Sequence, residues 1–194
     1  MTKLKNILLI LTLTMLVPVK ANAILPAGIY YGIRGGLNTT NKDNKINQIK
    51  LDTKSGKPFA SINAGIRLLS FRFEAEYAYR YNFTTYENPK SKKINAQNIM
   101  GNVYYNFLDI PLLKLYINGG VGNTKFSGCS GIDNKDNFTW NAGFGVNVSL
   151  FNTANLDVGY RYVDMGELKV KNGSDLVKLN QKAQDIYAGL RFGF

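Results

Sequence analysis

The chain has 194 residues, of which 24 are basic and 13 acidic, with no histidine and a single cysteine. This length favours one domain, and the lone Cys129 excludes an intramolecular disulfide. Without histidine, the chain lacks the side chain that most often acts as a general base near neutral pH, which argues against hydrolytic enzymes. No stretch beyond the N-terminus is apolar enough for a transmembrane helix, so a helical membrane protein is also excluded.

The N-terminus has the order of a secretory signal peptide. Lys3 and Lys5 precede an apolar stretch that is too short to span a bilayer, and Ala21 and Ala23 supply the small residues of a cleavage site. We therefore expect residues 1–23 to be a cleaved signal peptide.

Cleavage would leave residues 24–194 as a single domain. Without the three signal-peptide lysines, this part holds 21 basic against 13 acidic residues, a formal charge of +8. Apolar residues recur there at every second position in eight segments, which predicts β-strands with one apolar and one polar face. In chain order, the segments are residues 29–38, 60–68, 71–82, 96–107, 113–121, 138–150, 156–162 and 186–194.

The connections between these segments alternate between long and short. The long ones are rich in Lys, Asn, Asp or Gly and cover residues 39–58, 83–95, 125–137 and 165–182. An even number of strands, with short turns at one end and long loops at the other, is typical of outer-membrane barrels. The sequence thus predicts an all-β fold, an eight-stranded antiparallel up-and-down transmembrane β-barrel with four long external loops and three short periplasmic turns.

Aromatic residues on the apolar faces gather near both ends of the predicted strands, as they do in the interfacial girdles of membrane barrels. At the short-turn end they include Tyr31, Phe71, Phe73, Tyr105, Phe107, Phe192 and Phe194. At the long-loop end they are Tyr79, Tyr81, Phe138, Trp140, Tyr160 and Tyr162. A soluble sandwich has no need for two such groups, so the apolar faces are predicted to face lipid.

Three segments carry a resemblance to a known family: GIYYGIRGGLN from Gly28, LDVGYRYVDMG from Leu156 and AGLRFGF from Ala188. They resemble the outer-membrane β-barrel family of opacity-type surface antigens and OmpA- and OmpX-like small barrels. The resemblance implies a bacterial surface protein in the outer membrane of a Gram-negative cell. The terminal Phe194 is similar to the assembly signal that such proteins present to the barrel assembly machinery.

The polar faces of the predicted strands carry eleven charged residues directed at the barrel interior. Eight strands leave an interior just wide enough for side chains to fill, which favours a packed polar network over a charged pore or a catalytic carboxylate pair. Glu74 and Glu76 share one face, but no cleft marks them as an acid–base pair. The predicted lumen polar network comprises Arg34, Arg67, Arg72, Glu74, Glu76, Arg80, Lys114, Asp157, Arg161, Asp185 and Arg191.

Lysines concentrate in three of the long loops, whose net charges are +3, +2 and +2, so that +7 of the +8 lies at one end of the barrel. Such a basic crown would attract lipopolysaccharide phosphates, sulphated host glycans or acidic protein patches, although lysines that are merely solvated are an equal alternative. The candidate ligand-binding lysines are Lys42, Lys45, Lys50, Lys54, Lys57, Lys90, Lys92, Lys93, Lys169, Lys171, Lys178 and Lys182.

These observations predict a surface antigen or adhesin, with a small porin or a conduit for hydrophobic solutes as the alternative. No catalytic residue, cofactor or metal is expected, since Asp133 and Asp136 alone make a weak calcium site. The expected partners are outer-membrane lipid and lipopolysaccharide, the assembly machinery during biogenesis, and a host surface protein or glycan. Nucleic acid is excluded by export, and a monomer is expected.

Overall fold

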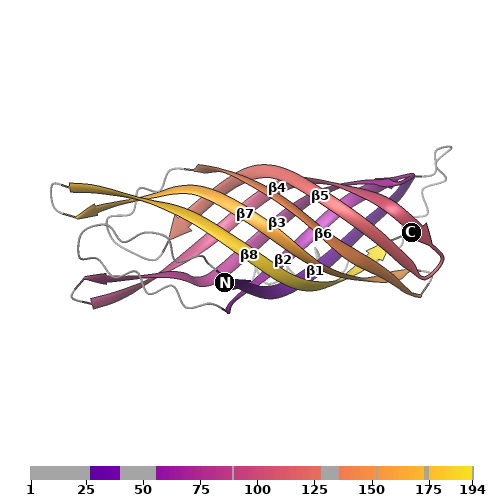
Figure 1. Cartoon of the computed structure of the whole chain (residues 1–194), viewed down its shortest axis with the longest axis horizontal. Coiled ribbons are helices and arrows are strands. Elements are labelled where there is room, and N and C mark those ends of the chain that lie inside the picture. Colours follow the sequence, from indigo (N-terminus) through magenta and orange to yellow (C-terminus); the bar gives the residue numbers. More distant parts are fainter. Residues whose placement is uncertain are drawn as a thin grey trace, which may run out of the picture.

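The computed structural model is a closed antiparallel barrel of eight strands (Figure 1). It describes residues 27–39, 56–88, 90–127, 136–151, 153–172 and 175–193, so the predicted signal peptide lies outside the described residues. The strands are β1 (Ala27–Thr39), β2 (Lys57–Leu68), β3 (Phe71–Asn88), β4 (Lys90–Ile110), β5 (Leu113–Ser127), β6 (Asn137–Phe151), β7 (Ala154–Asn172) and β8 (Asp175–Gly193). Among these residues, no helix is long and apolar enough to cross a membrane.

Each strand pairs with its neighbours in sequence, and β1 pairs with β8 to close the barrel, for example at Ile33 opposite Leu190. The predicted fold class is therefore confirmed. The turns after β2 and β4 are two residues long, and Leu69 in the first adopts a left-handed conformation with φ of 53°. Such a backbone is typical of tight two-residue hairpins.

Most strands are longer than the alternation predicts, and β3, β4, β7 and β8 extend furthest into the predicted long loops. β3 and β4 pair from Thr84 opposite Ile94 to Asn88 opposite Lys90, so most of the predicted loop 83–95 is strand. Likewise, β7 and β8 stay paired through much of the predicted loop 165–182. In an antiparallel hairpin the partner strand satisfies the backbone groups, so Lys- and Asn-rich segments can extend a strand without an apolar face.

These extensions form two-stranded ribbons that pair with no other strand of the barrel. We call residues 84–88 and 90–94 the β3–β4 ribbon, and residues 167–172 and 175–180 the β7–β8 ribbon. A register irregularity lies at the base of each, after Arg80 and after Asp164. Both ribbons project from the barrel end opposite the two-residue turns (Figure 1). The long-loop end is thus taller than the sequence predicts.

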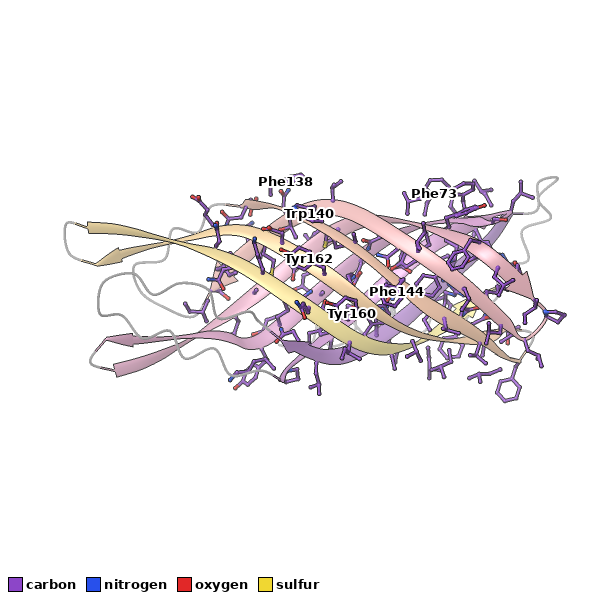
Figure 2. All side chains as sticks on the ribbon, in the orientation of Figure 1. Phe73, Phe138, Trp140, Phe144, Tyr160 and Tyr162 are labelled. Carbon is purple, nitrogen blue, oxygen red and sulfur yellow. The ribbon has the colours of Figure 1, made fainter. Side chains whose placement is uncertain are left out.

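The outer face of the barrel is apolar. Ile33 in β1, Ile62 in β2 and Ile99 in β4 are each more than half exposed. The residues immediately before and after each of them in its strand are buried inside. Figure 2 shows Phe73 towards the short-turn end and Phe138, Trp140 and Tyr162 towards the long-loop end, with Phe144 between the two groups. Outward aromatic rings contact one another at both ends. The ring centroids of Phe71 and Tyr105 are 5.0 Å apart, and those of Trp140 and Tyr162 are 5.5 Å apart.

Small residues leave an apolar hollow of about 600 Å³ on this outer face, across β8, β1 and β2. Gly35, Ala60 and Ala188 stand side by side in the sheet register and form its floor. Ile33 and Ile62 flank it.

Candidate functional site

The lumen is the most chemically dense part of the barrel. Alternation along every strand sends each second side chain inward, and an eight-stranded interior is narrow enough for these side chains to fill it. Among the described residues, nine charged side chains are buried there, five basic and four acidic. They are Arg34, Arg72, Arg80, Arg161, Arg191, Glu74, Glu76, Asp157 and Asp185.

Six of these residues form the central ion-pair chain, in which basic and acidic side chains alternate. Arg34 lies 3.2 Å from Glu74 and 3.1 Å from Glu76. Arg161 holds Glu76 at 2.6 Å and Asp185 at 3.2 Å. Arg80 binds both oxygens of Asp185, at 2.6 and 2.8 Å. The order of the chain is Glu74, Arg34, Glu76, Arg161, Asp185 and Arg80.

Neutral side chains supply further hydrogen bonds to the carboxylates of this chain. The hydroxyls of Tyr104 and Tyr30 donate to Glu74 at 2.9 and 3.2 Å, and Asn102 Nδ2 donates to Glu76 at 3.1 Å. A buried ion pair is favourable only when such extra bonds offset the loss of hydration. With three charges of each sign, the central ion-pair chain is neutral and joins β1, β3, β7 and β8 across the lumen.

A second group lies nearer the short turns and is centred on Asp157. Its Oδ2 is 3.5 Å from both Arg72 Nη1 and Arg191 Nη1, and Asn147 Nδ2 donates to its Oδ1 at 2.9 Å. The guanidinium of Arg72 lies over the rings of Tyr104 and Tyr116, at 4.4 and 4.9 Å. Because two arginines share one carboxylate, this group has an excess of positive charge.

Glycine makes room for the inward tyrosines. At Gly145, a Cβ would lie 2.5 Å from Tyr116 Cζ, and at Gly65 it would lie 2.8 Å from Tyr30 Cζ. Because a real Cβ cannot approach an atom so closely, only glycine at these two positions leaves room inside the barrel for the tyrosine rings.

Towards the long-loop end, the lumen holds a group of buried apolar side chains, which the sequence reasoning missed. Phe59, Phe126, Val163 and Met165 are all buried there, and the Arg80 guanidinium lies 4.9 Å from the Phe59 ring. The segments that hold Phe126 and Met165 read as loops. A continued count of alternate positions beyond residues 121 and 162 would have assigned both residues to the inner face.

Arg67 and Lys114 differ from the other predicted lumen residues. Both have the inward phase, but they lie close to the short turns, where Arg67 is exposed. Lys114 is partly exposed and pairs with Asp109 at 2.6 Å on the rim, not with the buried network. The prediction that they belong to a packed core is wrong, because alternation gives the face of a residue and not its depth.

The candidate ligand-binding lysines fall into four sets. Lys42, Lys45, Lys50 and Lys54 lie outside the described residues, as does the proposed assembly signal Phe194. The backbones of Lys90, Lys92 and Lys93 belong to the β3–β4 ribbon, and those of Lys169, Lys171 and Lys178 to the β7–β8 ribbon. Lys57 and Lys182 lie in β2 and β8, near the long-loop end.

In the part of the chain that the structure describes, no three Cys, Asp or Glu side chains cluster as metal ligands would. Each buried carboxylate instead has arginine or amide partners. The arrangement is suited to holding the strands together, and it presents no group poised for acid–base chemistry.

A closed barrel with an apolar outer face, aromatic residues near both ends and a polar, filled interior is the architecture of proteins that span bacterial outer membranes. The sequence matches the family described as "Outer membrane protein beta-barrel domain" over residues 8–194, and the protein belongs to that family. Its location is accordingly the outer membrane of a Gram-negative bacterium. No curated protein matches the chain in sequence.

Solved structures with the same fold include Neisserial surface protein A, which is 18% identical, covers 87% of this chain and 97% of its own, and has a TM-score of 0.60. OprG from Pseudomonas aeruginosa is 16% identical over 85% of this chain and 95% of its own, with a TM-score of 0.56. OprH from the same organism is 21% identical over 86% of this chain and 99% of its own, with a TM-score of 0.52. At these identities the likeness extends to the fold alone.

Proposed function

We propose that this protein is a surface antigen or adhesin, a structural barrel that displays basic loops and binds anionic ligands outside the cell. The observation that carries the proposal is the filled lumen. The central ion-pair chain crosses the interior, and the apolar residues around Phe59 and Phe126 close it towards the long loops. A barrel filled in this way serves as a rigid support rather than as a channel.

The two ribbons support the second half of the proposal. Lys169 stands directly opposite Lys178 in the β7–β8 ribbon, and Lys90, Lys92 and Lys93 follow one another along the β3–β4 ribbon. Like charges at opposed positions destabilise a hairpin, so lysine is a poor choice here for stability alone. A role in attracting anions accounts for this placement.

The proposal predicts binding to a sulphated glycan surface that weakens as salt is raised, because exposed charges are screened within about 8 Å at physiological ionic strength. The test compares cells that display the wild-type protein with cells that display a triple variant, Lys169→Gln, Lys171→Gln and Lys178→Gln. We expect the variant to lose most of the salt-sensitive binding.

A Lys→Arg triple variant at the same positions is the matched control, since it keeps the charge and should keep the binding. Equal amounts of folded protein are verified by heat-modifiable gel migration. Binding that survives the Gln substitutions unchanged would rule out the lysines of this ribbon as the contact.

A conduit for hydrophobic solutes is the second candidate, and the apolar hollow over Gly35, Ala60 and Ala188 is the observation in its favour. Planar-bilayer conductance separates the two functions. A stable ohmic step that changes when Arg72 is replaced would contradict the filled, structural barrel.

We also propose export through cleavage after Ala23. N-terminal sequencing of protein purified from outer membranes should then begin at Ile24. A chain that retains Lys3 and Lys5 would contradict this.

A further inference from the structure

Three arginines converge at the short-turn mouth of the barrel, and we call Arg67, Arg72 and Arg191 the mouth arginines. They come from β2, β3 and β8 and, together with Tyr30 and Asn155, line one cavity of about 70 Å³. Arg67 and Arg72 stand directly opposite each other in the register of β2 and β3. Like charges at opposed positions repel, and an anion bound between the two guanidinium groups would offset this repulsion.

Among the described residues, the buried charge of the lumen is unbalanced at this mouth. The central ion-pair chain is neutral, and Lys114 is matched by Asp109 on the rim. Among the described residues, the mouth arginines have ion pairs with only one carboxylate, that of Asp157. The cluster therefore carries a net formal charge of +2 around a cavity.

Arg72 has donors that no group of the described residues satisfies. Its side chain is buried, yet its Nε and Nη2 have no hydrogen-bond partner, and its Nη1 reaches Asp157 only at 3.5 Å. The rings of Tyr104 and Tyr116 lie over the guanidinium and leave the in-plane N–H groups free. Buried donors of this kind are normally paired, so the cavity requires acceptors.

We propose that this cavity binds a phosphate group, with the mouth arginines as its ligands. A tetrahedral oxyanion offers acceptors in several directions, and arginine pairs with phosphate through two parallel N–H···O bonds. One water molecule needs about 10–15 Å³ of cavity volume on this measure, so a cavity of about 70 Å³ has room for a group as large as a phosphate. Short turns mark the periplasmic end of such barrels, where inner-leaflet phospholipid headgroups and free phosphate are both within reach.

The test uses the full protein purified from outer membranes in an uncharged maltoside detergent and phosphate-free buffer. Inorganic phosphate is titrated at constant ionic strength and followed by calorimetry. We expect saturable binding at one site, weakened about tenfold or more by Arg67→Gln, because one charge-assisted hydrogen bond is lost. Arg67 is exposed, so this variant should fold, and heat-modifiable migration verifies that it does.

Lys114→Gln is the matched control, since it removes a cation from the same rim that is already paired with Asp109. It should leave phosphate binding unchanged. Absence of saturable binding, as expected if water alone fills the cavity, would overturn the proposal. Equal weakening by Lys114→Gln would overturn it as well, because the effect would then be one of general charge.

A competition arm identifies the source of the phosphate. If a short-chain phosphatidylglycerol displaces inorganic phosphate from the wild-type protein and Arg67→Gln abolishes that competition, the site holds a lipid headgroup. If inorganic phosphate binds and the lipid fails to compete, the site holds the free anion. If the lipid competes equally in both proteins, it acts away from the mouth arginines, and their assignment as ligands is refuted.

Discussion

Replacing Asp185 with Asn should strongly destabilise the barrel. Asp185 is completely buried and accepts two short hydrogen bonds from Arg80, with a further contact from Arg161. Arg161 would still hold Glu76 after the substitution. Arg80 has Asp185 as its only carboxylate partner among the described residues, so its charge would be left buried and unpaired.

Removal of one partner from a buried ion pair costs about 3–5 kcal/mol, because the remaining charge is neither hydrated nor neutralised. Arg80 keeps its bond to Asn98 Oδ1 at 2.9 Å and the ring of Phe59, neither of which replaces a full negative charge. We therefore expect about 3 kcal/mol or more for Asp185→Asn. This corresponds to at least a hundredfold change in the unfolding equilibrium.

Urea unfolding of the barrel in lipid vesicles measures this difference. The single Trp140 lies on the lipid face and reports transfer to water through its fluorescence. Asp109→Asn is the matched control, because it breaks the exposed Lys114 pair and should cost less than about 1 kcal/mol. If both variants lose the same small amount, the central ion-pair chain does not hold the barrel together.

Three further changes test the two faces of the wall. Ala75→Arg puts a charge on the lipid side and should impair insertion by about 2–4 kcal/mol if Ala75 sits at midplane. Ala75→Leu should be tolerated, and the refolding yield in vesicles distinguishes the two variants. Tyr104→Phe removes the hydroxyl that donates to Glu74 and should cost about 1.5–3 kcal/mol in urea unfolding, while Tyr105→Phe, its outward neighbour, should cost almost nothing. Gly145→Ala should cost about 1–3 kcal/mol because the new methyl group meets the Tyr116 ring. Gly119→Ala meets nothing closer than 3.7 Å, so an equal loss there would contradict the packing argument.

The face to which a residue points was predictable from sequence, because the period of a strand is fixed by its backbone. Residues 71–82 show this, since Arg72, Glu74, Glu76 and Arg80 are all buried as their phase requires. Met100 and Tyr104 obscured the alternation in β4, yet both point inward.

The depth of a residue in the lumen and the identity of its ion-pair partner were not predictable from sequence. Arg67 and Arg72 have the same phase and stand opposite each other beside the same turn, but Arg67 is exposed and Arg72 is buried. The difference arises because the rings of Tyr104 and Tyr116 cover Arg72. The choice of Asp185 as the partner of Arg80 depends on the curvature and tilt of the closed sheet. The ribbons were missed for a different reason. Their pairing is specified by the partner strand and not by an apolar face.

The ion pairs of the lumen also constrain the order in which the barrel can form. Arg80 and Asp185 are 105 residues apart, and Arg161 and Glu76 are 85 apart, so neither pair can form within a single hairpin. Until β8 pairs with β1, several inward charges lack partners and must stay hydrated. The apolar outer face of the same strands is meanwhile already favoured in lipid. A membrane-inserted sheet that lacks β8 would leave Arg80 without Asp185. We therefore expect closure and loss of water from the inner face to be one concerted event, with no stable seven-stranded form inserted in the bilayer.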